Sequence, residues 1–336
     1  MVDLSVLRLF LILSLFSATL KADTLGDVID ALDMQRLAAT YTELQVDRLL
    51  NGAGRELPEG DRRAAAVLAT LGVLSPTDLA HPPSLQEKIK PYLEVLPRNH
   101  PALIGRVGDA GLPLALERDW QHYALEHDGL VGILEPRLSS GVVTGYDVRR
   151  RGIYDGFARG TVFIYSHSSR LHLKQLILLL AAEELPAWVY VTPKLGAFLY
   201  REEWGGQPEA IKTLSSGVRV IKSHEFAVLF QFDSPSDRIR FHQIILKHAK
   251  RDSAGETDLI ADSWWQPFYY TDAPLEGFKP ISLLILQYGD LEATLTVPEA
   301  RTSAVISAFG EAAANLRRQR VWVNPAFYRF LHGDFK

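Results

Sequence analysis

The strongest constraint on the fold is a strand–helix pattern that occurs twice in the second half of the chain. In segment 161–185 an apolar strand leads into a helix that begins at Arg170, and in segment 226–250 the same succession leads into a helix that contains Arg238. Arg, Gln, Ile and Leu coincide at corresponding positions of the two helices. The match predicts a duplicated β-α unit. The alternative is that two amphipathic helices after strands share apolar spacing by chance.

A fainter third copy follows, in which apolar runs at 281–286 and 293–297 precede a helix that contains Arg301. Two or three such units predict a mixed α/β domain over 141–336, built from ferredoxin-like repeats.

Residues 23–140 differ from that domain, because their apolar residues recur at intervals of three and four. Leu25 and Val28 begin one such stripe, and Leu37, Tyr41 and Leu44 continue it. This spacing is typical of amphipathic helices. We therefore expect a helical domain over 23–140, and an α+β class for the whole chain.

The first 22 residues have the pattern of a secretory signal peptide. The run 9–20 is uncharged and mostly apolar, and it lies between Arg8 and Lys21. A membrane-spanning helix needs about 20 apolar residues, whereas a signal core needs 7 to 15. We expect cleavage after Ala22, with a retained N-terminal anchor as the alternative. The expected location is periplasmic or secreted, with no transmembrane segment in the mature chain.

Composition excludes several functional classes. The 36 Lys+Arg residues against 40 Asp+Glu give a net charge of −4, which disfavours nucleic acid as a partner. The absence of cysteine excludes disulfides and thiolate metal sites. His122 and His127 stand five residues apart, about 140° around a helix, so they match no zinc motif. We expect neither a metal nor a cofactor.

The starts of the repeated helices are candidate ligand sites. A cation in the first turn opposes the helix dipole by about 0.3–1 kcal/mol, so three such arginines indicate a bound anion or an acidic neighbour. Nearby hydroxyl and imidazole groups would suit a phosphate or a carboxylate. The alternative is ordinary helix capping with surface ion pairs. The candidate ligand-binding residues are Ser166, His167, Ser169, Arg170, Ser234, Arg238 and Arg301.

A second candidate combines carboxylates with aromatic rings. Asp258 and Asp262 are one helical turn apart, and Trp264 and Trp265 follow them directly. Two carboxylates can act as acid and base in glycoside hydrolysis, and aromatic rings can stack on sugars. The alternative is that the rings pack in the core while both carboxylates are solvated.

Together these patterns favour a noncatalytic accessory or binding protein that recognises an anionic small molecule, a glycan or an envelope protein. The alternative is a polysaccharide-acting enzyme that hydrolyses glycans with Asp258 and Asp262 beside Trp264 and Trp265. No familiar catalytic motif, such as G-x-S-x-G or G-x-G-x-x-G, occurs in the sequence.

Overall fold

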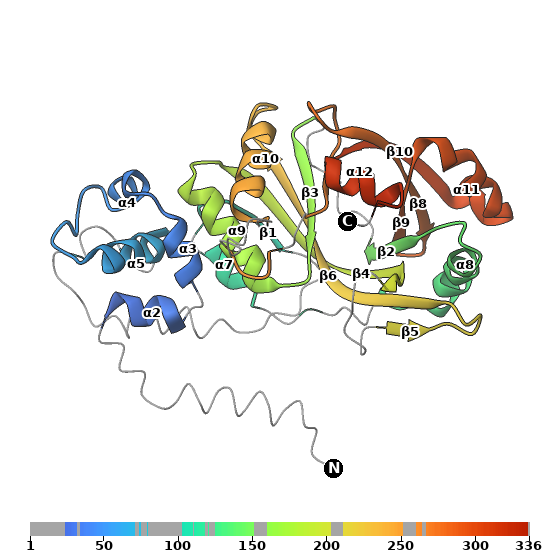
Figure 1. Cartoon of the computed structure of the whole chain (residues 1–336), viewed down its shortest axis with the longest axis horizontal. Helices are drawn as coiled ribbons and strands as arrows, with labels where there is room; N and C mark the ends of the chain where they lie inside the picture. The colour runs from blue at the N-terminus through green and yellow to red at the C-terminus, as the bar shows by residue number, and fades with distance from the viewer. Residues whose placement is uncertain are drawn as a thin grey trace, which may run out of the picture. The chain divides into compact units, whose positions relative to one another are not determined.

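The computed structural model divides into two compact units, residues 1–69 with 73–93 and residues 70–72 with 94–336 (Figure 1). The structure describes residues 24–31, 34–70, 74, 79, 103–109, 111–117, 120, 125–150, 160–202, 211–250, 260–263 and 267–334. The signal peptide predicted for residues 1–22 lies outside these ranges. No helix among the described residues is both long enough and apolar enough to cross a membrane.

The first unit is helical in its described part. Its helices are α2 (Leu25–Ala31), α3 (Gln35–Thr40), α4 (Glu43–Leu49) and α5 (Glu59–Thr70). A capping box between Thr42 and Gln45 fixes the start of α4. Arg62 of α5 forms ion pairs with Glu43 and Asp47 of α4, which ties the two helices together.

The second unit is a closed antiparallel β-barrel of eight strands with two further strands attached. Its hydrogen-bonded ring runs β4–β2–β9–β8–β10–β7–β3–β6, and β6 pairs with β4 along the whole of β4 to close it. The ring strands are β2 (Gly145–Arg150), β3 (Val162–His167), β4 (Ala187–Leu199), β6 (Arg219–Phe232), β7 (Tyr269–Thr271), β8 (Lys279–Tyr288), β9 (Leu291–Val297) and β10 (Leu316–Val323). The attached strands are β1 (Leu103–Arg106), beside β4, and β5 (Ile211–Thr213), beside β6.

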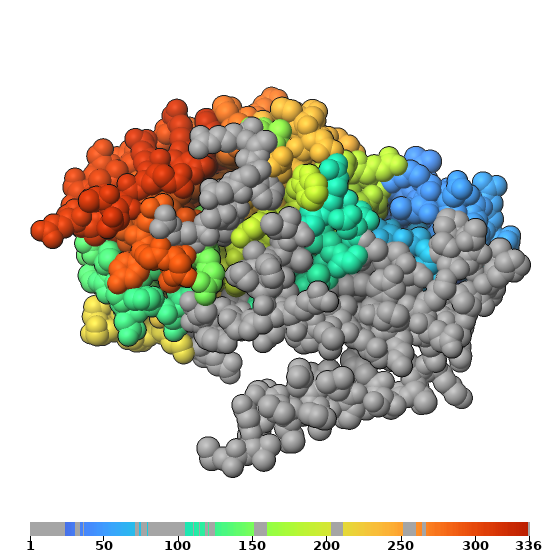
Figure 2. Space-filling model, turned by 180° about the vertical axis from the view of Figure 1, so that it is seen from behind, coloured from blue at the N-terminus to red at the C-terminus, as the bar shows by residue number. Residues whose placement is uncertain are grey.

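Several helices of this unit cover the outer face of the barrel, while the last one packs against an apolar cluster on the inner face. Those of this unit are α7 (Gly111–Ala115), α8 (Asp128–Ser139), α9 (Arg170–Ala182), α10 (Asp237–His248), α11 (Thr302–Ala308) and α12 (Pro325–Leu331), with 3₁₀ turns η4 (Glu299–Arg301) and η5 (Gly310–Asn315). Leu134 of α8 and Val305 of α11 pack with Tyr146 and Val148 of β2 in one apolar cluster. Figure 1 shows α8 and α11 at the same end of the barrel, and Figure 2 shows that end from behind. Phe241 of α10 covers another part of the wall, where its ring meets several aromatic rings from the strands.

The inner face is apolar in one part. Ile164, Leu229 and Leu283 lie in a cluster there, and Phe327 and Leu331 of α12 pack against it. Tyr190 packs on the same cluster, and the charged Lys194 lies four residues further along the same face of β4. The inner face therefore changes from apolar to charged along β4.

The predicted fold class is wrong. Strand and helix do follow each other in both expected segments, as β3 with α9 and as β6 with α10. The strands, however, belong to one closed antiparallel ring and not to ferredoxin-like α/β units. The region expected to be only helical also contributes β1, which pairs with β4. Local patterns predicted the elements, but pairings such as β10 with β7 decide the architecture, and no local pattern encodes them.

Candidate functional site

Five ionisable side chains from four neighbouring strands gather on the inner face of the barrel. We call them the inner charged cluster: Asp147 and Arg149 of β2, Lys194 of β4, Glu225 of β6 and Glu292 of β9. Directly opposed residues of an antiparallel pair project from the same face of a sheet. The strand register opposes Arg149 to Glu292 and Lys194 to Glu225. Their neighbours Tyr146 and Val148 face outward under α8 and α11, so the cluster faces inward.

Two short ion pairs hold most of this cluster. Arg149 Nε lies 2.8 Å from Glu292 Oε1, and Lys194 Nζ lies 3.1 Å from Glu225 Oε2. Lys194 also donates a hydrogen bond to Ser166 Oγ at 3.2 Å. Asp147 lies further from both cations, at 3.7 Å from Lys194 and 3.9 Å from Arg149. Ser166, a candidate from the sequence, thus lies at the edge of the cluster.

Most of the cluster is buried, and burial alone would favour the neutral, deprotonated form of an isolated lysine. The side chains of Arg149 and Lys194 are 1% and 9% exposed. Burial lowers the pKa of Lys194, whereas the Glu225 and Asp147 carboxylates raise it, and the net pKa lies above the ordinary value. Lys194 is therefore an ammonium at neutral pH, which makes it an ion-pair partner and neither a base nor a nucleophile.

Two acceptor oxygens beside the ion pairs are unused. Asp147 Oδ1 and Thr294 Oγ1 are buried and have no hydrogen-bond partner among the described residues. Asp147 and Thr294 are directly opposed across β2 and β9, so both project from the inner face. Buried polar atoms without a partner are rare in folded proteins. This pair therefore marks the part of the barrel interior that has spare hydrogen-bonding capacity.

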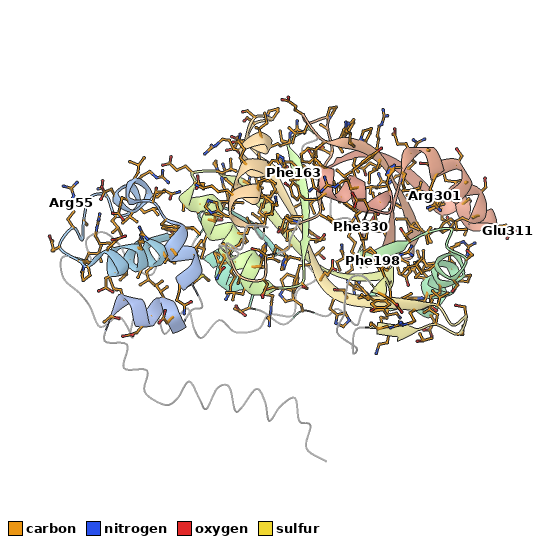
Figure 3. All side chains as sticks on the ribbon, viewed as in Figure 1. Arg55, Phe163, Phe198, Arg301, Glu311 and Phe330 are labelled. Atoms are coloured by element: carbon orange, nitrogen blue, oxygen red, sulfur yellow. The ribbon has the colours of Figure 1, made fainter. Side chains whose placement is uncertain are left out.

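An aromatic ring covers the same sheet next to Asp147. Gly145 stands opposite Phe198, and Gly196 stands opposite Asp147. A Cβ atom on Gly145 would lie 2.2 Å from Phe198 Cδ1, and one on Gly196 would lie 2.8 Å from Phe198 Cε2. The two glycines thus let the Phe198 ring lie flat against the strands. Figure 3 labels Phe198 on β4.

This contact gives a testable stability prediction. We expect Gly145→Ala to lower the free energy of unfolding by about 1–3 kcal/mol, because the new methyl group would displace the Phe198 ring. Urea unfolding followed by circular dichroism measures the change. Gly132→Ala is the control: a Cβ there meets nothing within 4 Å, and alanine should stabilise α8 by about 0.5–1 kcal/mol. Equal effects of the two substitutions would contradict the proposed contact.

The candidate site at the start of α9 is a buried histidine pair. Ser169 caps the helix by accepting from the His172 amide at 3.2 Å. His167 Nδ1 accepts from the Ser169 amide at 2.9 Å, so its Nε2 donates to the Asp262 carbonyl at 2.9 Å. His172 lies between the Ala261 carbonyl and the Tyr165 hydroxyl, both at 2.8 Å. The two imidazoles stack at 3.8 Å.

Burial keeps both imidazoles neutral. It lowers the pKa of His167 to about 4, and together with His167 it holds the pKa of His172 well below the usual 6.5. The two rings therefore tie the end of β3 and the start of α9 to residues 262 and 261 through neutral hydrogen bonds. An anion site at this helix start stays a prediction.

The three predicted arginines bind different parts of the second unit. Arg170 lies 3.7 Å from the Glu117 carboxylate. Arg238 is buried and donates to the Thr271 hydroxyl at 3.0 Å, and Arg301 donates to the Val142 carbonyl at 3.1 Å. Ser234, which was expected to act with Arg238, makes a hydrogen bond to Asp237 at 2.8 Å. Each guanidinium thus has its own partner within the chain.

The carboxylate–aromatic candidate is described only at Asp262. Its backbone has φ of +53° and its carbonyl accepts from His167. Asp258, Trp264 and Trp265 lie outside the described residues, so the glycan-site hypothesis stays a prediction. Within the described part of the chain, no group of three or more His, Cys, Asp or Glu residues could hold a metal ion.

No protein-family model matches this chain, and no curated protein or solved structure matches it either. The geometry of the inner charged cluster is therefore the main guide to function. This cluster was not predicted from the sequence, although a signal was present: Lys194 and Glu292 are each the single charged residue of an otherwise uncharged strand. A charge inside an apolar strand indicates either a solvent-facing position or a buried polar site, and only the strand register distinguishes the two.

Proposed function

We propose that this chain is a noncatalytic binding protein that holds a small polar molecule against the inner face of its β-barrel. The observation that carries the proposal is the burial of four ionisable side chains on that face, with a fifth, Asp147, partly buried beside them. Eight-stranded barrels have an interior that side chains can fill or that can hold one small ligand, and ligands commonly enter at a barrel mouth.

Stability alone gives no reason for such a cluster. Each buried ion costs several kcal/mol in lost hydration. Replacing a buried ion pair by apolar residues of similar volume often leaves the free energy of unfolding unchanged or raises it by about 1–4 kcal/mol. The neighbouring inner face shows that this barrel packs well with residues such as Ile164 and Leu229. A polar ligand is a physical reason to keep charged groups where apolar ones would fill the space.

The state of the cluster favours binding over catalysis. Lys194 is held as an ammonium by two carboxylates, and Arg149 is paired with Glu292 at 2.8 Å. Paired ions of this kind orient a ligand but do not transfer protons at neutral pH. We retain the periplasmic or secreted location as part of the proposal. Glycan hydrolysis remains the alternative hypothesis, with its residues at Asp258 and Asp262.

The test is a ligand screen with a variant that replaces the central ion pair. Thermal shift, followed by calorimetric titration, would compare amines, sugars, carboxylates and phosphates on the wild type and on Lys194→Met with Glu225→Leu. Ligand at about 100 times its Kd stabilises a protein by about 2.7 kcal/mol. We expect at least one class to raise the Tm of the wild type and to shift the Tm of the paired variant by a clearly different amount, because the variant removes two charges of the cluster.

Arg301→Ala serves as the control, because Arg301 is exposed and lies outside the cluster. It should respond to ligand as the wild type does. A ligand that stabilises the wild type and the paired variant equally would overturn the proposal, and so would a screen in which no class changes the Tm of the wild type.

A further inference from the structure

We infer that the ligand carries a primary ammonium group, which donates hydrogen bonds to Asp147 Oδ1 and Thr294 Oγ1 beside the Phe198 ring. This inference rests on the proposed function and specifies the chemistry of its ligand.

The charge balance of the inner charged cluster comes first. Each cation has a close carboxylate of its own: Arg149 with Glu292 at 2.8 Å and Lys194 with Glu225 at 3.1 Å. Asp147 is the third carboxylate, and it lies at 3.7 Å or more from both cations. The cluster therefore holds one carboxylate more than its cations balance. A ligand that enters with a single positive charge would complete it.

The two acceptor oxygens without a hydrogen bond point to the same chemistry. A carboxylate oxygen can only accept, and the Thr294 hydroxyl can accept or donate. Both oxygens are buried, and neither has a hydrogen-bond partner in the part of the chain that the structure describes. Thr294 is only 2% exposed, so its hydroxyl cannot rely on bulk solvent. A primary ammonium supplies up to three N–H donors, enough for both oxygens at once.

The aromatic ring supports a cation over a neutral donor. Phe198 stands two residues beyond Gly196, which is directly opposite Asp147. Both lie on the inner face, and the ring approaches the position of a Gly196 Cβ to 2.8 Å. Aromatic faces attract ammonium groups by about 0.5–2 kcal/mol. Phe198 is only half-buried, so the described neighbours do not seal this part of the barrel.

Other ligand chemistries fit less well. An anion would meet cations that already have close carboxylate partners, together with the excess carboxylate of Asp147. A metal ion needs several negatively charged or imidazole ligands at one point, and the described residues include no such group. A neutral alcohol could donate to Asp147, but it would leave the charge of the cluster unbalanced.

The experiment uses the full chain and defined probes. Ethanolamine and 5-aminopentan-1-ol would be titrated calorimetrically, with ethylene glycol and 1,5-pentanediol as neutral counterparts, potassium as an inorganic cation and tetramethylammonium as a cation without N–H donors. We expect the two amines to bind and to raise the Tm. The diols, potassium and tetramethylammonium should have no comparable effect.

Two near-isosteric variants locate the site. Asp147→Asn should weaken amine binding by about tenfold or more, because it removes a charged acceptor, and Thr294→Val should weaken it by a smaller factor. Asp290→Asn is the matched control, since Asp290 pairs with Arg150 at the exposed end of β2. It should bind amine as the wild type does. The Tm of each variant without ligand shows whether it folds.

The outcomes separate the inference from the proposed function. Amine binding that Asp147→Asn leaves unchanged would overturn the inference, as would equal binding of potassium or of the diols. Sugars or carboxylates could bind in a manner that depends on Lys194 and Glu225 while amines fail to bind at all. In that case the inference fails and the proposed function survives. If no probe binds and the wider screen also finds nothing, both fail.

Discussion

Replacing Lys194 by methionine is expected to lower the free energy of unfolding by about 3–5 kcal/mol, while replacing Lys194 and Glu225 together by methionine and leucine should cost much less. The single change leaves the Glu225 carboxylate, 8% exposed, without the ammonium that lies 3.1 Å away. It also removes the cation nearest to Asp147. The double change removes the close pair as a unit, so the Glu225 position no longer carries a buried charge.

The measurement is chemical unfolding of wild type, Lys194→Met, Glu225→Leu and the double variant, combined in a double-mutant cycle. Lys222→Met is the control, because Lys222 is more exposed and lies 3.9 Å from Glu135. Surface pairs of this kind contribute about 0–1 kcal/mol. A double variant as unstable as the sum of the two single variants would show that Lys194 and Glu225 do not act as a pair, and the cluster would then need a different account.

Helices with local sequence signals could be predicted from the sequence. The helix predicted to begin at Arg170 does so as α9, and the helix containing Arg238 is α10. Apolar spacing and helix-start residues determine such elements within a few residues of chain. Even locally, tertiary packing overrides the pattern: Leu44 was assigned to the apolar stripe but is 77% exposed, whereas Val46 two residues later is fully buried.

The barrel could not be predicted in this way, because its closure depends on pairings between distant segments. β10 joins β8 on one side and β7 on the other, and β6 returns to β4 over thirteen registered pairs. Strand–helix succession is compatible with several sheet arrangements, and the local sequence does not choose among them. The repeat was therefore interpreted as separate α/β units when both copies contribute to one ring.

The candidate site was missed for the same reason. Asp147 and Thr294 are far apart in sequence and become neighbours only through the β2–β9 register. A shift of one residue in that register would turn Asp147 to the outer face, under α8 and α11. By contrast, His167, Ser169 and Arg170 were visible because they lie within four residues of chain at a helix start, and the structure shows that each already has a partner within the protein.

Acidification is expected to destabilise the protein strongly between about pH 6.5 and pH 4. Burial lowers the pKa of His167 and of His248 to about 4, and it holds the pKa of His172 well below 6.5. In the unfolded chain each imidazole titrates near the ordinary value of about 6.5. The unfolded state therefore binds protons in this window that the folded state does not. Stability is complete above about pH 6.5 and is lost as the pH falls toward 4.

The expected loss is about 3 kcal/mol for His167 alone, since each pKa unit corresponds to about 1.36 kcal/mol. Urea unfolding at pH 7, 5.5 and 4.5 measures it. His248 provides the clean variant, because neither of its ring nitrogens has a hydrogen-bond partner among the described residues. His248→Leu should keep the stability of the wild type at pH 7 and lose less on acidification.

His332→Gln is the matched control, since His332 is exposed at the end of α12. It should follow the wild type at every pH. If His248→Leu and the wild type lost the same stability between pH 7 and pH 4.5, the His248 imidazole would have to be protonated in the folded protein, and Glu183, 3.9 Å from its Nε2, would be the group that accommodates the charge. Such a result would move the source of acid sensitivity to the stacked pair of His167 and His172. Protonation of these rings would break the hydrogen bond from the Ser169 amide to His167 and reverse the one between Tyr165 and His172.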